Sequence, residues 1–87
     1  MNISVSPGFE KDLQKLTKKS SQISVEMKRK LELFKLNPDH PSLRLHKLKG
    51  SMRHYWSISI KGNLRIIFEY IENGIILLDI GTHDDVY

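Results

Sequence analysis

Three apolar runs in the second half of the chain constrain the fold more than any other feature of the sequence. They are "YWSISI", "LRIIFEY" and "IILLDI", at residues 55–60, 64–70 and 75–80. Each has the length of a β-strand and is rich in β-branched and aromatic residues. The stretches "KGN" and "ENG" between them contain glycine and asparagine, which suit tight hairpin turns. Residues 55–80 therefore predict an antiparallel meander, and the alternating "LRLHKL" before it predicts one more strand.

The first forty residues predict a short strand followed by two helices. Residues 2–5 alternate in polarity, and Ser6 followed by Pro7 is typical of a helix start. Apolar side chains then recur at helical spacing in two stripes, which are Phe9, Leu13 and Leu16, and Ile23, Met27, Leu31 and Phe34. "NPDHP" ends the second helix, because proline cannot continue it. The sequence therefore predicts an α+β fold, in which the N-terminal strand and the two-helix hairpin pack on one face of the mainly antiparallel meander.

The strand register follows from the length assumed for the two turns. Three-residue turns give the pairs Trp56–Phe68, Ile58–Ile66, Ile60–Leu64, Ile66–Ile80, Phe68–Leu78 and Tyr70–Ile76. This register places nine apolar residues on a single face, which are Trp56, Ile58, Ile60, Leu64, Ile66, Phe68, Ile76, Leu78 and Ile80. Two-residue turns would instead bring Arg65 and Asp79 into that layer, because a one-residue slip turns every side chain over. We therefore predict three-residue turns.

Length, composition and charge exclude several classes of protein. A chain of 87 residues is short enough for one domain, expected to span residues 1–87. It contains no cysteine, no signal-peptide pattern and no apolar run near the ~18 residues of a membrane span. The four histidines lack the spacing of a zinc site, so no metal and no other cofactor is predicted. The net charge of +4 favours polyanionic partners, and a cytoplasmic location is the default expectation.

The last hairpin predicts a candidate site for chemistry. Its register places Arg65 opposite Gly81, and His83 follows two residues later. Arginine can bind a phosphate through two parallel hydrogen bonds, and histidine can exchange a proton near neutral pH. RNA supplies its own nucleophile, the 2′-hydroxyl, so such a pair could cleave RNA, but not DNA, without a metal. The alternatives are that His83 is an ordinary surface residue and that Arg65 pairs with Glu69 or Asp79.

Other polar side chains are expected near the same edge of the sheet. His46 lies at the end of the strand that precedes the meander, and Tyr87 ends the chain. The basic residues predicted to attract RNA are Lys47, Lys49, Arg53 and Lys61. The simpler alternative for the basic residues is a solvated edge that deters aggregation between sheets.

The chain resembles the RelE/ParE superfamily of bacterial toxins from type II toxin–antitoxin modules. The resemblance covers nearly the whole chain and rests on "LHKLKGSMRHYWSISI", "GNLRIIFEY" and "LLDIGTHDDVY". The ending "GTH…Y" is most similar to the YafQ and RelE branches, whose members are ribosome-dependent mRNA endonucleases. The resemblance therefore implies the toxin component of such a module, an endoribonuclease (mRNA interferase) that inhibits translation.

The resemblance also implies roles for four residues. His83 matches the terminal histidine of YafQ-like enzymes and is expected to be the general acid. His46 matches a second YafQ-type histidine, ahead of a similar Leu-x-Gly-Ser stretch, and is the expected base. Arg65 matches an arginine of RelE-like toxins that contacts the scissile phosphate. Tyr87 matches an aromatic residue near the end of both branches, and it is expected to position the substrate.

The chain departs from the YafQ pattern at three positions. Ser59 stands where YafQ has a further catalytic histidine, Asn63 where it has an acidic residue, and Asp79 where it has an arginine. The partners implied by the resemblance are a small acidic antitoxin, mRNA and the ribosome. One alternative is the ParE branch of the same fold, which inhibits DNA gyrase and cleaves no RNA. Another is a non-catalytic module whose main partner is its antitoxin.

Overall fold

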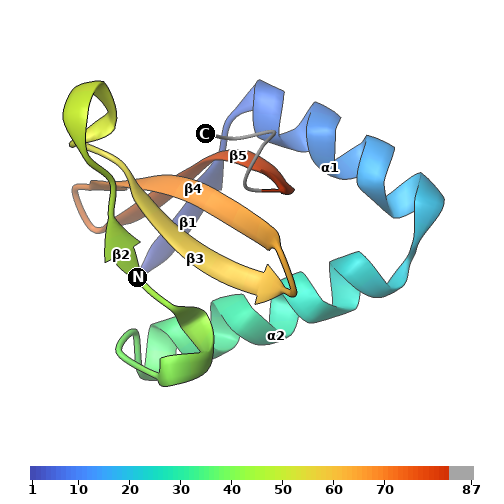
Figure 1. Ribbon diagram of the computed structural model, residues 1–87, viewed down its shortest axis with the longest axis horizontal. Coiled ribbons are helices and arrows are strands. Elements are labelled where there is room, and N and C mark those ends of the chain that lie inside the picture. The colour runs from blue at the N-terminus through green and yellow to red at the C-terminus, as the bar shows by residue number, and fades with distance from the viewer. Residues whose placement is uncertain (83–87) are drawn as a thin grey trace.

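The computed structural model describes residues 1–82, which form two helices and a five-stranded sheet (Figure 1). The elements are β1 (Asn2–Val5), α1 (Pro7–Lys19), α2 (Gln22–Leu36), the 3₁₀ turn η1 (Pro41–Leu43), β2 (His46–Lys47), the 3₁₀ turn η2 (Gly50–Met52), β3 (Trp56–Lys61), β4 (Leu64–Ile71) and β5 (Gly74–Thr82). The strand order is β1–β5–β4–β3–β2, with β1 parallel to β5 and the other neighbours antiparallel. The predicted α+β fold class is confirmed.

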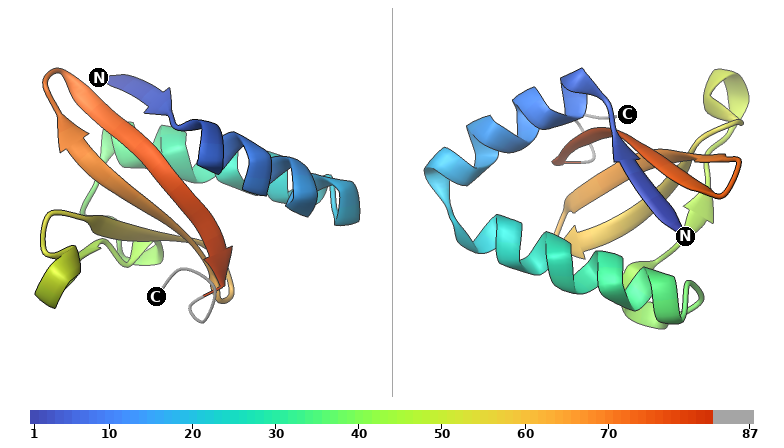
Figure 2. Two further views of the ribbon diagram at one scale, coloured as in Figure 1. Left: turned by 90° about the horizontal axis from the view of Figure 1, so that it is seen from above. Right: turned by 180° about the vertical axis from the view of Figure 1, so that it is seen from behind.

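Both helices lie along one side of the sheet (Figure 2), and the sequence explains where α1 begins. The hydroxyl of Ser6 accepts a hydrogen bond from the Phe9 amide at 3.1 Å and donates one to the Leu78 carbonyl at 3.2 Å. Pro7 takes the first helical position, where its missing N–H is not needed. The N-cap therefore attaches the start of α1 to β5.

The main core lies between the helices and the sheet. Its buried residues are Phe9, Leu31, Phe34, Leu43, Ile58, Ile60, Ile66, Phe68, Ile75, Leu77 and Ile80. The rings of Phe34 and Phe68 meet edge to face, with their centroids 5.4 Å apart. A second, smaller cluster packs Leu48 and Ile67 against Met52 and Tyr55, under the β2–β3 connection. Within residues 1–82, no helix is long and apolar enough to cross a membrane.

The β3–β4 hairpin has the predicted register except at its turn. The confirmed pairs are Trp56–Phe68 and Ile58–Ile66. The predicted pairing of Ile60 with Leu64 is wrong, because Lys61 pairs with Leu64 and the turn contains two residues. Ile60 is the extra residue of a β-bulge that restores the register beyond it. Gly62 has a φ of 55°, the left-handed conformation that such a short turn requires.

The β4–β5 hairpin contains a second bulge, at Leu78. On the side of the candidate site, the confirmed pair is Ile66–Ile80. On the side of the turn, the predictions for Phe68 and Tyr70 are wrong, and the observed pairs are Phe68–Leu77 and Tyr70–Ile75. This turn also contains two residues where three were predicted, and the bulge restores the predicted register beyond Leu78. As a result Ile75 and Leu77 enter the core in place of Ile76 and Leu78.

Candidate active site

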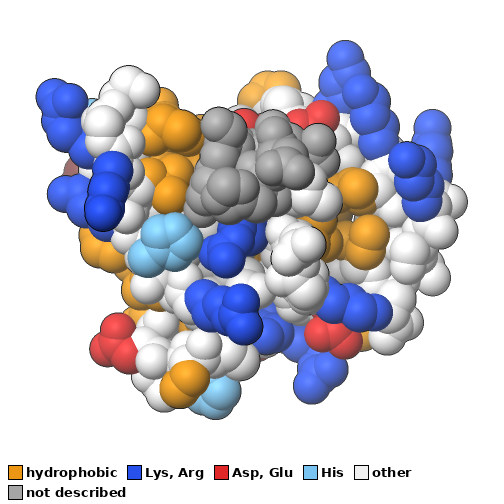
Figure 3. Space-filling view, in the orientation of Figure 1, with side chains coloured by type: hydrophobic (Ala, Val, Ile, Leu, Met, Phe, Trp, Pro, Cys, Tyr) orange, Lys and Arg blue, Asp and Glu red, His pale blue; other side chains and the backbone are white. Residues whose placement is uncertain are grey.

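The face of the sheet away from the main core presents two neighbouring rows of side chains. The strand pairings define one row as His46, Ser57, Ile67 and Asp79, and the next as Ser59, Arg65 and Gly81. Directly paired residues point to the same face of a sheet. His46 and Arg65 therefore share a face, two strands and one row apart. Figure 3 shows a histidine next to Lys and Arg side chains near the middle of one face of the molecule.

One nitrogen of the Arg65 guanidinium group has no hydrogen-bond partner within residues 1–82. The residue is half-buried, and its Nη1 atom is buried with no hydrogen-bond partner in the described part of the chain. The ion pairs of residues 1–82 do not include Arg65, so neither Glu69 nor Asp79 neutralises it there. A buried N–H without an acceptor is costly, more so when it is charged. An anion that reached this buried atom would satisfy it.

His46 has one ring nitrogen fixed by the backbone. Its Nδ1 lies 3.1 Å from the carbonyl oxygen of Arg44, and a carbonyl can only accept a hydrogen bond. Nδ1 therefore carries the hydrogen, and in the neutral ring the lone pair is on Nε2. This is the tautomer that a histidine needs to accept a proton through Nε2.

The four basic residues predicted to bind RNA are all exposed, but they do not meet at one point. Lys49 and Arg53 flank η2, and Lys61 lies at the other end of β3. Lys47 pairs with Trp56. Because successive strand residues point to opposite faces, Lys47 lies on the other face of the sheet from His46.

His83 and Tyr87 lie outside the described residues, so their roles stay predictions. The part of β5 that leads to them is described: Gly81 pairs with Arg65, as predicted, and Thr82 pairs with Leu64. Residues 1–82 contain no group of three or more His, Asp or Glu side chains that could hold a metal ion.

Asp79 interacts with α1 and not with Arg65. Asp79 and Asp12 line a hollow of about 410 Å³ between β5 and α1, together with Lys15, Leu16, Lys19, Ile80 and Gly81. Burial raises the pKa of Asp79, and a hydrogen bond with Asp12 and the negative charge of Asp12 raise it further. Asp79, which stands where YafQ has an arginine, therefore does not neutralise the charge of Arg65.

The structure also forms a basic hollow that the sequence reasoning missed, here called the Lys30–Arg44 hollow. It has a volume of about 600 Å³ and is lined by Lys30, Pro41, Ser42, Arg44, Ser59, Ile60, Lys61, Gly62 and Asn63. The expected strand "LRLHKL" begins later than predicted, because η1 takes up Leu43 and Arg44 adopts a left-handed conformation with φ 48°. No pattern in the sequence signals that turn, and the alternation of "LRLHKL" instead predicts a strand at Arg44.

The whole chain, residues 1–87, matches the family model described as the bacterial toxin of type II toxin–antitoxin system, YafQ. The chain belongs to the YafQ family of type II toxins. The match confirms the resemblance seen in "LHKLKGSMRHYWSISI" and "LLDIGTHDDVY". It favours the YafQ branch over the ParE branch of the superfamily.

Solved structures of bacterial toxins share this fold along nearly their whole length. A copper-bound mutant toxin from Helicobacter pylori is 26% identical over 100% of this chain and 99% of that chain, with a TM-score of 0.84. YafQ from Escherichia coli strain BL21(DE3) is 22% identical over 99% and 97%, with a TM-score of 0.81. A chain of the E. coli DinJ–YafQ toxin–antitoxin complex is 22% identical over 99% and 96%, with a TM-score of 0.80. No curated protein matches the sequence.

Proposed function

We propose that this YafQ-family toxin is an endoribonuclease that cleaves mRNA on the ribosome. The observation that carries the proposal is the unpaired, buried Nη1 of Arg65 on the same face as His46. The guanidinium group lacks an acceptor and would donate to an anion that reaches it, and the imidazole has the tautomer that accepts a proton through Nε2. Cleavage of a phosphodiester by the neighbouring ribose hydroxyl requires both functions.

The reaction follows from these two groups and the end of the chain. His46 Nε2 removes the proton from the 2′-hydroxyl, whose oxygen attacks the adjacent phosphorus. Arg65 donates two hydrogen bonds to the phosphate and stabilises the charge that develops on it. The bond from phosphorus to the 5′-oxygen breaks, His83 gives that oxygen a proton, and Tyr87 positions the substrate. The products are a cyclic phosphate and a free 5′-hydroxyl.

Cleavage of mRNA during translation tests this proposal. Purified protein is added to translating ribosomes, and the mRNA ends are mapped and their chemistry determined. We expect new 5′-hydroxyl ends, and no cut where a single 2′-deoxynucleotide replaces the nucleotide before the cleaved bond. Intact mRNA together with inhibition of DNA supercoiling by gyrase would contradict the proposal and favour a ParE-like activity.

We also propose an antitoxin partner and a cytoplasmic location, where mRNA and ribosomes are found. The similar E. coli YafQ has been solved in complex with DinJ. The net charge of +4 suits a small acidic protein that is partly disordered before it binds. Co-purification with the product of the adjacent gene, as a complex that blocks mRNA cleavage, is the expected result. A neighbouring gene product that neither binds nor inhibits would contradict it.

A further inference from the structure

The Lys30–Arg44 hollow is lined by three cationic residues, and no step of the proposed reaction uses it. Its lining contains the cations Lys30, Arg44 and Lys61, two serines and an asparagine, and no carboxylate. On α2, Glu26 is one turn before Lys30, but it pairs with Arg29 at 3.1 Å. Its charge is therefore already matched, and the hollow keeps an excess of positive charge.

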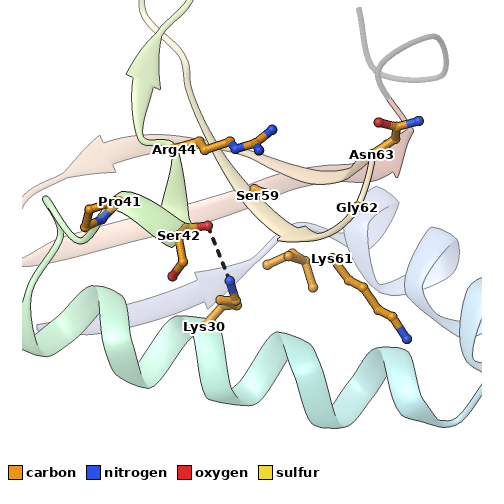
Figure 4. A pocket seen from close by; sticks show the side chains of 9 residues that line it. Lys30, Pro41, Ser42, Arg44, Ser59, Lys61, Gly62 and Asn63 are labelled. Carbon is orange, nitrogen blue, oxygen red and sulfur yellow. Dashed lines mark hydrogen bonds between the residues drawn. The ribbon is translucent and has the colours of Figure 1, made fainter.

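The fold holds the ammonium group of Lys30 and the backbone of Arg44 in place. Lys30 Nζ donates to the carbonyl oxygen of Ser42 at 3.3 Å, which fixes the ammonium group between α2 and η1. Arg44 caps η1 through its own N–H, 3.2 Å from the Pro41 carbonyl oxygen, and takes a left-handed conformation (φ 48°, ψ 44°). That conformation is unfavourable for an arginine. In Figure 4 the Arg44 side chain extends along β3, above Ser59, and Lys30 rises from α2 toward Ser42.

The hollow adjoins the proposed cleavage site through Ser59. The side chain of Ser59 lines the hollow, and Ser59 is the cross-strand partner of Arg65. An RNA strand that places one phosphate on Arg65 and continues over Ser59 therefore enters the hollow. The backbone of Arg44 also accepts the hydrogen bond from His46, so the same residue borders the base and the hollow.

We propose that the Lys30–Arg44 hollow binds the phosphate of the nucleotide next to the cleaved linkage. This inference rests on the proposed function, because it takes Arg65 as the site of the cleaved phosphate. Lys30 and Arg44 bind the charge of the neighbouring phosphate, and Ser42 and Asn63 offer hydrogen bonds to its oxygens or to the ribose. With the hollow and Arg65 together, the toxin binds at least two consecutive phosphates of the RNA.

The test compares three short RNA probes by titration into ¹⁵N-labelled full-length protein, followed by NMR. The probes are the dinucleotide ApA with 2′-O-methyl groups, which cannot be cleaved, and the same compound with an added 5′- or 3′-phosphate. We expect one of the two phosphorylated probes to bind about tenfold tighter than bare ApA, since a charged hydrogen-bonded contact is gained. The amide signals of Arg44, Lys61 and Asn63 should shift with that probe.

Variants separate the hollow from the cleavage site. Lys30→Gln combined with Arg44→Asn should reduce the gain from the extra phosphate to about twofold or less, and asparagine tolerates the left-handed conformation of residue 44. Lys28→Gln removes one charge from the exposed side of the same helix and should keep the gain. Equal binding of all three probes to the wild type, or a gain that survives the double variant, would overturn the inference. If Arg65→Gln binds bare ApA as tightly as the wild type does, the result would contradict the proposed function instead. It would also contradict the position of the hollow beside the cleaved bond.

Discussion

Arg65 lies directly opposite Gly81 across the β4–β5 pair, with its Nη1 buried and unpaired within residues 1–82. Gly81 presents no side chain that could cover or neutralise the guanidinium. The chain then has only Thr82 before His83, the residue expected to protonate the leaving oxygen. The hairpin thus places the group proposed to bind the phosphate next to the segment that leads to the predicted acid.

Substitution of His46 should abolish cleavage without unfolding the protein. His46 is exposed, and one of its contacts is the hydrogen bond from Nδ1 to the Arg44 carbonyl. In His46→Asn, the side-chain amide can keep that bond while the basic Nε2 is lost. We expect cleavage on translating ribosomes to fall about 100- to 10,000-fold, the usual contribution of a general base, with an unchanged melting temperature. Wild-type cleavage by this variant would remove His46 from the mechanism.

Gly74→Ala should detach β1 from the sheet. A Cβ at residue 74 would collide with the backbone of Asn2, in particular its carbonyl oxygen. We expect a loss of about 3 kcal/mol in the free energy of unfolding by urea, at the upper end of overpacking costs. The amides of Asn2 and Ser6, which now bond to the Asn73 and Leu77 carbonyls at 2.9 Å, should exchange faster.

Gly8→Ala is the matched control for that substitution. A Cβ at Gly8 meets only the Ser6 hydroxyl oxygen, at the ordinary distance of 3.9 Å. This variant should be stabilised by up to about 1 kcal/mol, because alanine restricts the unfolded chain. Equal stability losses in the two variants would contradict the assigned role of Gly74.

Asp79→Asn should stabilise the fold at neutral pH and not in acid. Burial and the neighbouring Asp12 raise the pKa of Asp79 above its usual 3.8, so the folded state holds this proton more tightly than the unfolded chain. Stability therefore falls as the pH rises from 3.8 through the raised value, and the ionised carboxylate disfavours the fold above it. We expect a gain in melting temperature of about 2–4 °C at most at pH 7, as for other exposed positions.

The pH dependence distinguishes this effect from a simple change of charge. The gain from Asp79→Asn should disappear below the usual carboxyl value, where both states are protonated. Glu72→Gln, in the exposed β4–β5 turn, removes the same charge away from Asp12 and serves as the control. A gain that is constant with pH, or equal in the two variants, would contradict the Asp12–Asp79 interaction.

The architecture could be predicted from the sequence because its signals are local. The Ser6–Pro7 start of α1, most of the two apolar stripes and the three strands of the meander appear in the structure as expected. The bulges at Ile60 and Leu78 could not be predicted, since a two-residue turn plus a bulge gives the same distant register as a three-residue turn. The errors in strand register are therefore confined to the residues between each bulge and its turn, and the other error is the late start of β2.

The sequence predicts the arrangement of the candidate site only where a hairpin fixes which residues face each other. The opposition of Arg65 and Gly81 follows from the register, and the structure has it. The shared face of His46 and Arg65 depends on the strand order β4–β3–β2, which no local pattern determines. Lys30 and Arg44 line the basic hollow only because α2 and η1 pack against β3. Neither residue belongs to a periodic sequence pattern that would predict this packing.

The binding of a phosphate by Arg65 is the central claim, and cleavage by Arg65→Gln on translating ribosomes tests it most directly. Arg29→Gln, which removes an exposed arginine paired with Glu26 on α2, is the control. Because Nη1 of Arg65 has no partner in the described chain, its loss should not lower the melting temperature. The account predicts cleavage reduced about 100- to 1,000-fold in Arg65→Gln, as when a donor to a developing charge is removed, and wild-type cleavage in Arg29→Gln. Cleavage by a folded Arg65→Gln protein at the wild-type rate would contradict it.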